Sequence, residues 1–160
     1  MAIFIRYLAS NRHIVFYLFF CLSLFSCFDP VTEEPFTILT TTGMLGDAVK
    51  NIVKEDAHVV SLMGPGIDPH TYQTTQKDVQ QLMHAHMVFY NGLDLEGKMS
   101  NLLKEMAKER KVYAVSDALD KTALLYEGTI GADPHFWFDV KLWKQVVGFI
   151  SQKLQEARPE

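Results

Sequence analysis

The sequence predicts an α/β fold in which a four-stranded parallel sheet is flanked by helices. Four short segments rich in β-branched and apolar residues alternate with segments whose apolar residues recur every three or four positions. This alternation is typical of right-handed βαβ crossovers, which build a parallel sheet covered on both faces. The expected strands are residues 36–41, 58–63, 87–90 and 111–115, and the expected helices are residues 44–54, 77–84, 99–110 and 139–157.

The first unit begins with the buried strand 36–41, which Gly43 ends. The second strand, 58–63, runs into a loop over residues 64–75 that contains Gly64-Pro65-Gly66. In parallel sheets, ligands bind beyond the carboxyl ends of the strands. This loop is therefore a candidate site. The helix between the two strands has its apolar residues on one face: Leu45, Ala48, Val49, Ile52 and Val53.

The last expected helix starts at Asp139, whose side chain is suited to cap its first turn. One apolar stripe follows at steps of three and four residues. The four strands leave this stripe without a cover, so we expect an exposed terminal helix that promotes self-association. The stripe consists of Val140, Trp143, Val147, Ile150 and Leu154.

Residues 1–26 have the layout of a secretory signal of the lipoprotein type. Basic residues precede an apolar run over residues 14–25, which is shorter than the roughly 20 residues of a membrane-spanning helix. Residues 24–27 resemble a bacterial lipobox, which implies that Cys27 is lipidated and anchors the chain to a membrane, although Phe25 is bulkier than usual. The alternative is an ordinary signal peptide. Residues 27–35 then form a tether.

The charge balance argues against nucleic acid as a partner. The formal net charge is −4, and the signal segment holds two of the fifteen basic residues and no acidic residue. The remainder is therefore more acidic than the whole chain, whereas a phosphate-binding surface needs positive charge. The motifs G-x-S-x-G, G-x-x-x-x-G-K-[ST] and H-E-x-x-H do not occur in the sequence, so no enzyme is predicted.

Two Asp-Pro-His tripeptides predict a metal site. Asp68-Pro69-His70 and Asp133-Pro134-His135 lie in two different loops. Proline fixes its own φ and extends the residue before it, so each histidine leaves a stiff backbone that loses little entropy on binding. Either aspartate is suited to accept a hydrogen bond from the non-ligating ring nitrogen. The alternative interpretation is a pair of surface turns.

Other histidines and aromatic residues give weaker signals. His84 and His86 lie at the junction of a helix and a strand, and His58 opens a strand, so all three are interpreted as surface residues. The aromatic segment 136–138 is expected to pack in the core beside the site, with lining of a pocket as the alternative.

Four stretches of the sequence carry a resemblance to a known family: residues 42–44 with 47–52, residues 62–72, residues 90–96 and residues 133–140. Together they resemble the metal-binding (TroA-like, cluster A-I) solute-binding proteins of bacterial ABC importers for manganese, zinc and iron. The resemblance implies that His70 and His135 are the first two ligands of a divalent metal (Mn²⁺, Zn²⁺ or Fe²⁺), which the protein delivers to a membrane permease. It also implies an exported protein in the periplasm or on the cell surface.

The resemblance divides the chain into an N-terminal metal-binding lobe at 36–138 and the start of an interlobe helix at 139–160. In the family, a third and a fourth ligand come from a second lobe, which we expect to be absent from this sequence. Two alternatives are a lipid-anchored, adhesin-like interaction protein and an inactive fragment. A zinc hydrolase would need a general base, for which only Asp68 and Asp133 are near.

Overall fold

The computed structural model describes residues 35–126 and 131–158. The expected signal peptide, the expected lipidation site Cys27 and nearly all of the expected tether lie outside these residues. Among the described residues, no helix has the length and apolar character needed to cross a membrane.

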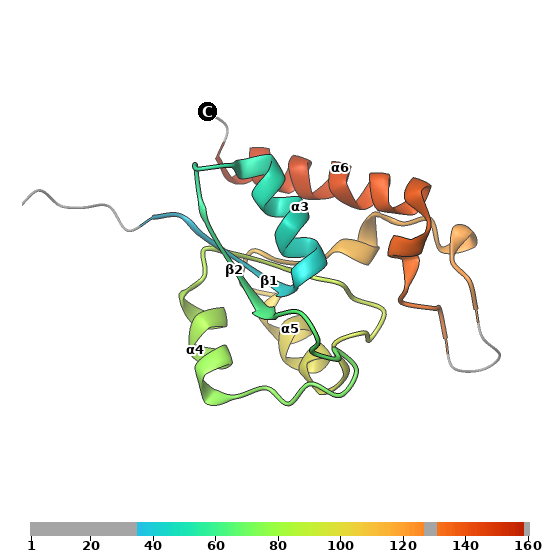
Figure 1. Cartoon of the computed structure of the whole chain (residues 1–160), viewed down its shortest axis with the longest axis horizontal. Helices are drawn as coiled ribbons and strands as arrows, with labels where there is room; N and C mark the ends of the chain where they lie inside the picture. Colours follow the sequence, from blue (N-terminus) through green and yellow to red (C-terminus); the bar gives the residue numbers. More distant parts are fainter. Residues whose placement is uncertain (1–34, 127–130, 159–160) are drawn as a thin grey trace, which may run out of the picture. The chain divides into compact units, whose positions relative to one another are not determined.

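The described residues build the predicted sheet, with four parallel strands in the order β2-β1-β3-β4 (Figure 1). The central strands β1 and β3 are almost wholly buried, which explains their unbroken apolar and β-branched composition. The fold class is confirmed, with strand ends shifted by no more than two residues. The strands are β1 (Thr37–Thr42), β2 (His58–Met63), β3 (Met87–Tyr90) and β4 (Val112–Ala114).

Helices cover both faces of the sheet (Figure 1). On one face, α3 (Gly43–Val53) and α6 (Val140–Ala157) share a core with Ile38 and Phe89. On the other face, α4 (Gln76–His84) and α5 (Ser100–Met106) pack on a second core. Side chains of successive strand residues point to opposite faces, so each strand contributes to both cores.

The helix expected at 99–110 is shorter in the structure. A short 3₁₀ segment, η1 (Gly97–Met99), precedes α5, and the helix ends at Met106. The amides of Lys108 and Glu109 donate to carbonyls three residues back, which tightens the last turn. Arg110 instead donates to the carbonyl oxygens of Met83 and Ala85, at the end of α4. The Arg110 side chain thus joins the end of this helical segment to the end of α4.

The expectation of an uncovered stripe on the terminal helix is wrong. Ile150 is fully buried, together with Leu142 and Val146, because α6 packs on α3 and the sheet. Val140, which the sequence placed in the stripe, is 81% exposed. The inward face of the helix is therefore centred on Leu142, Val146 and Ile150, with Trp143 and Leu154 of the predicted stripe packed at its border. Self-association through an exposed apolar stripe loses its basis. The cap is confirmed, since the Asp139 carboxylate accepts from the amides of Lys141 and Leu142.

Candidate metal centre

His70 lies in the loop that leaves the carboxyl end of β2. The Asp68 carboxylate accepts a hydrogen bond from the His70 amide at 3.0 Å and another from the Thr71 hydroxyl at 2.9 Å. Asp68 thus fixes the backbone of the loop, and among the described residues its hydrogen-bond partners do not include the His70 imidazole. The His70 ring remains exposed, apart from its neighbours in the site.

His135 lies just before the 3₁₀ segment η4 (Phe136–Phe138) and helix α6. Asp133 Oδ1 accepts from the His135 amide at 2.9 Å and contacts His135 Nδ1 at 2.6 Å. The hydrogen bonds from the His135 amide and ring lower the pKa of Asp133. An ionised carboxylate only accepts hydrogen bonds, so Nδ1 carries the proton and Nε2 keeps a free lone pair. The expected contact from aspartate to imidazole is therefore present at His135.

The two imidazoles meet. Nε2 of His70 and Nε2 of His135 lie 3.3 Å apart, with ring centroids separated by 5.3 Å. Two nitrogens held by one tetrahedral zinc at 2.0–2.1 Å lie about 3.3–3.4 Å from each other. The same spacing also suits a hydrogen bond in which one ring nitrogen is protonated. The pair can therefore hold either one proton or one metal ion.

Within residues 35–126 and 131–158, no group of three or more His, Cys, Asp or Glu side chains is placed to hold a metal ion. Two imidazoles make up half of a tetrahedral ligand set. Water or other donors would fill the remaining positions.

The aromatic segment beside His135 divides into three environments. Phe136 is buried in the core, as expected, whereas Phe138 is 82% exposed and the core prediction is wrong for it. Trp137 packs edge-on against the His135 ring, at 5.1 Å between centroids. Phe136, Phe138 and His135 line an open cavity of about 500 Å³, which fits the alternative interpretation of the segment as a pocket lining.

The other histidines among the described residues lie on the surface, as predicted. His58 and His84 are exposed, and Nδ1 of His84 contacts the Gln80 carbonyl oxygen at 2.7 Å. His86 is exposed too, but its Nδ1 accepts a hydrogen bond from the Thr37 amide at 3.0 Å. His86 thus secures the start of β1, at the edge of the sheet opposite to the metal centre.

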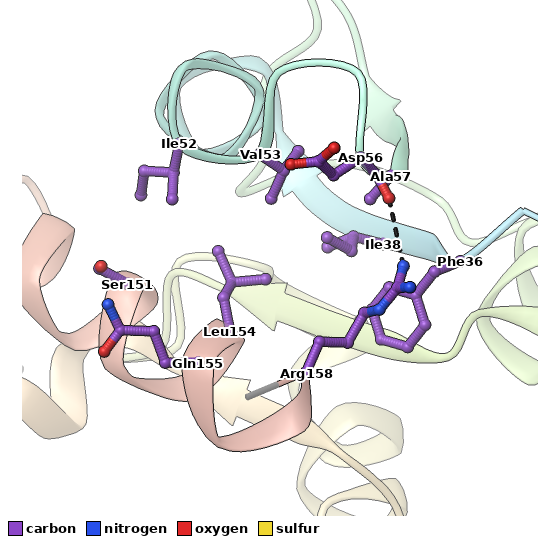
Figure 2. A pocket seen from close by; sticks show the side chains of 10 residues that line it. All are labelled: Phe36, Ile38, Ile52, Val53, Asp56, Ala57, Ser151, Leu154, Gln155 and Arg158. Carbon is purple, nitrogen blue, oxygen red and sulfur yellow. Dashed lines mark hydrogen bonds between the residues drawn. The ribbon is translucent and has the colours of Figure 1, made fainter. Parts of the chain in front are cut away.

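A second cavity, of about 380 Å³, lies at that opposite edge, between the ends of α3 and α6 (Figure 2). Figure 2 shows Leu154 of α6 facing this space and Arg158 donating to the Asp56 carbonyl oxygen. The Arg158 guanidinium also stacks over the Phe36 ring. This cavity includes no residue of either Asp-Pro-His loop and lies where α6 packs beside α3.

Two residues of the site were not predicted. Asn91 is fully buried, and its side-chain amide donates to the Pro134 carbonyl oxygen at 3.2 Å. Glu96 is also fully buried, and its carboxylate accepts from the Asn91 amide and the Thr41 hydroxyl. Burial raises the pKa of Glu96, while these hydrogen bonds oppose the rise. The available signal was the Asn91-Gly92 pair at the carboxyl end of a strand.

The chain matches the family model of the zinc-uptake complex component A, periplasmic (ZnuA), over residues 38–160. It is 43% identical to the zinc-binding protein TroA of Treponema pallidum (strain Nichols) over 122 residues, which are 76% of this chain and 40% of TroA. It is 38% identical to the manganese-binding lipoprotein MntA of Bacillus subtilis (strain 168) over 129 residues, which are 80% of this chain and 42% of MntA.

Solved structures agree with the sequence matches. The periplasmic zinc-binding protein TroA from Treponema pallidum superposes with a TM-score of 0.75 at 43% identity, covering 79% of this chain and 45% of that one. Fe(III)-bound YtgA from Chlamydia trachomatis gives a TM-score of 0.67 at 27% identity, covering 77% and 44%. The chain spans less than half the length of each of these relatives. Both the resemblance and the fold that it implied are confirmed, and this chain belongs to the ZnuA family of periplasmic metal-binding proteins.

Proposed function

We propose that this chain forms one wall of the metal-binding cleft of an extracytoplasmic receptor. The receptor would take a divalent transition metal, Mn²⁺, Zn²⁺ or Fe²⁺, as its substrate and deliver it to an ABC permease. The observation that carries the proposal is the distance of 3.3 Å between His70 Nε2 and His135 Nε2. The names of the relatives support it, since they include a zinc-binding protein, a manganese-binding lipoprotein and an Fe(III)-bound protein.

Each residue of the paired tripeptides has a distinct role in this proposal. His70 and His135 bind the metal through Nε2, and Asp133 holds the His135 ring in the required tautomer. Asp68 closes the loop around His70. Pro69 and Pro134 stiffen the approach to each histidine. Imidazoles suit zinc, whereas added carboxylates favour manganese, so the remaining ligands would decide between the metals.

The location outside the cytoplasm rests on the relatives and on the N-terminal sequence. The family is described as periplasmic, and MntA is named a lipoprotein. In our proposal, residues 1–26 are removed, Cys27 is lipidated and residues 27–35 tether a lobe at 36–138. Replacing Cys27 by Ser should then move the chain from the membrane fraction to the soluble fraction. Equal membrane retention of both forms would argue against the anchor.

The decisive experiment is titration calorimetry of the full chain with Zn²⁺ and with Mn²⁺. We expect one weak site, because two imidazoles are half of a closed ligand set. His70→Ala and His135→Ala should each abolish it. His84→Ala is the matched control, since His84 is exposed on α4 and remote from the site. Absence of binding to the parent chain, or binding that survives both substitutions, would show that the proposal is wrong.

A further inference from the structure

One short segment, residues 91–97, contacts both histidine loops. At its start, the Asn91 side chain donates to the carbonyl oxygen of Pro134, the residue before His135. At its end, Gly97 lies against the His70 carbonyl oxygen, so closely that a Cβ added at Gly97 would be 2.5 Å from that oxygen. Both histidine loops are therefore positioned against the same piece of backbone, residues 91–97.

The backbone of this segment is strained. Leu93 and Asp94 are consecutive non-glycine residues with φ of 53° and 59°, in the left-handed region. Gly92 and Gly97 also have positive φ, at 83° and 49°. Strain of this kind persists only where the surroundings over-determine the conformation, and it gathers at functional sites.

The Glu96 carboxylate supplies that constraint. Oε1 accepts from the Asn91 amide at 2.6 Å and from the Thr41 hydroxyl at 2.8 Å, and Oε2 accepts from the Gly92 amide at 3.2 Å. The end of the turn is thereby tied to its beginning and to β1. The ion pairs formed between described residues do not include Glu96, although its side chain is fully buried. A buried acid without a cationic partner is a costly way to gain stability, which favours a role in fixing geometry.

We propose that Glu96 is a positioning residue that sets the separation of the two imidazoles, by clamping the turn 91–97 against both histidine loops. This inference rests on the proposed function in taking His70 and His135 as the ligands. Glu96 itself does not contact the metal. Its carboxylate acts through Asn91 on the loop of His135, while the turn that it closes ends at Gly97, against the loop of His70.

Glu96→Gln is the sharpest variant, because it keeps the shape of the side chain. A glutamine has one oxygen and one NH₂ group, so it cannot accept from all three donors, and one contact becomes donor against donor. We expect the turn to relax and the hydrogen bond from the Asn91 side chain to the Pro134 carbonyl oxygen to weaken. Glu156→Gln is the matched control, because Glu156 is an exposed glutamate of α6 that pairs with Lys153.

The first measurement needs no metal. In the metal-free full chain, nuclear Overhauser contacts between the ring protons of His70 and His135 report their separation. The second measurement is the affinity for Co²⁺, together with the intensity of its visible d–d bands, which distinguishes tetrahedral from octahedral coordination. We expect Glu96→Gln to weaken or lose the contacts between the rings, and to reduce Co²⁺ affinity about tenfold or more with weaker bands. Glu156→Gln should match the parent chain in both measurements.

A purely structural role for Glu96 gives a different pattern. Glu96→Gln would then lower the stability of the fold, but the folded variant would keep the ring contacts and the Co²⁺ affinity of the parent. That result would overturn the inference. If the parent chain binds no Co²⁺, the proposed function fails, and the ring contacts of the metal-free variants still decide whether Glu96 sets the geometry of the pair.

Discussion

Nε2 of His70 and Nε2 of His135 lie 3.3 Å apart, although 65 residues separate the two histidines in the sequence. The first follows the carboxyl end of β2, and the second belongs to a loop tied to Asn91, which follows the carboxyl end of β3. Protons and metal ions compete for these nitrogens, because only a deprotonated ring nitrogen binds a metal. Acid should therefore weaken metal binding by the chain.

The two aspartates of the paired tripeptides should differ in importance. Asp133→Asn replaces the carboxylate that contacts His135 Nδ1 and should weaken Co²⁺ binding about ten- to hundredfold. Asp68→Asn changes a side chain that accepts from the His70 amide and the Thr71 hydroxyl, so its effect on Co²⁺ binding should be smaller. Calorimetry of both variants checks the order. Equal losses would mean that stiffening of the loops, and not support of the ring, is what the aspartates provide.

Gly97→Ala should separate the two histidine loops. The new Cβ would meet the His70 carbonyl oxygen, and the left-handed backbone adds about 1–2 kcal/mol to the cost for an L-residue. We expect lower stability in urea unfolding and weaker metal binding. Gly66→Ala is the control, since Gly66 also has positive φ but a Cβ there meets nothing within 4 Å. If the two variants lose equal stability and affinity, the close approach to His70 has no effect of its own.

The order of strands and helices could be predicted because it is encoded in local patterns. Each strand is a short apolar or β-branched run, and each crossover helix has its own periodicity. The pairing of His70 with His135 was predictable for another reason. The same stiff tripeptide occurs twice, and one copy follows the carboxyl end of a strand, where ligands bind in parallel sheets.

The Asn91 and Glu96 contacts could not be predicted in this way. They join residues far apart in sequence: Asn91 and Pro134 are 43 positions apart, and Thr41 and Glu96 are 55 positions apart. A glutamate is rarely fully buried, so the residue type gives no reason to expect Glu96 in the core. Only the folded chain shows that three donors converge on its carboxylate.

The inward face of α6 could not be predicted from the spacing of its apolar residues either. Steps of three and four residues fit two neighbouring stripes of this helix, and the sequence could not choose between them. The structure predicts that Ile150→Ala costs about 2–5 kcal/mol of unfolding free energy, since Ile150 is fully buried. Val140→Ala should change it by no more than about 0.5 kcal/mol, because Val140 is 81% exposed. Urea unfolding of both variants tests the assignment, and a larger loss at Val140 would reverse it.

Burial raises the pKa of Glu96, so the folded chain binds this proton more tightly than the unfolded chain does. The contribution of Glu96 to the free energy of unfolding is then largest at low pH. It falls as the pH rises from the ordinary glutamate value of 4.5 to the raised value of the folded state, and it is constant above that. Glu96→Gln removes this titration. The variant should therefore be most destabilised, relative to the parent chain, at the low-pH end of this range.

Urea unfolding of the parent chain and of Glu96→Gln at a series of pH values measures this difference. The difference in unfolding free energy between the parent chain and Glu96→Gln should narrow as the pH rises from 4.5 to the raised pKa of Glu96. Glu156→Gln should behave in the opposite sense, because hydrogen bonds from Lys153 and Gln152 lower the pKa of Glu156. Its contribution is present above the ordinary glutamate pKa and is lost as the pH falls. A Glu96→Gln gap that widens with pH would mean that the three hydrogen bonds outweigh burial, and that the carboxylate is stabilised in its charged form.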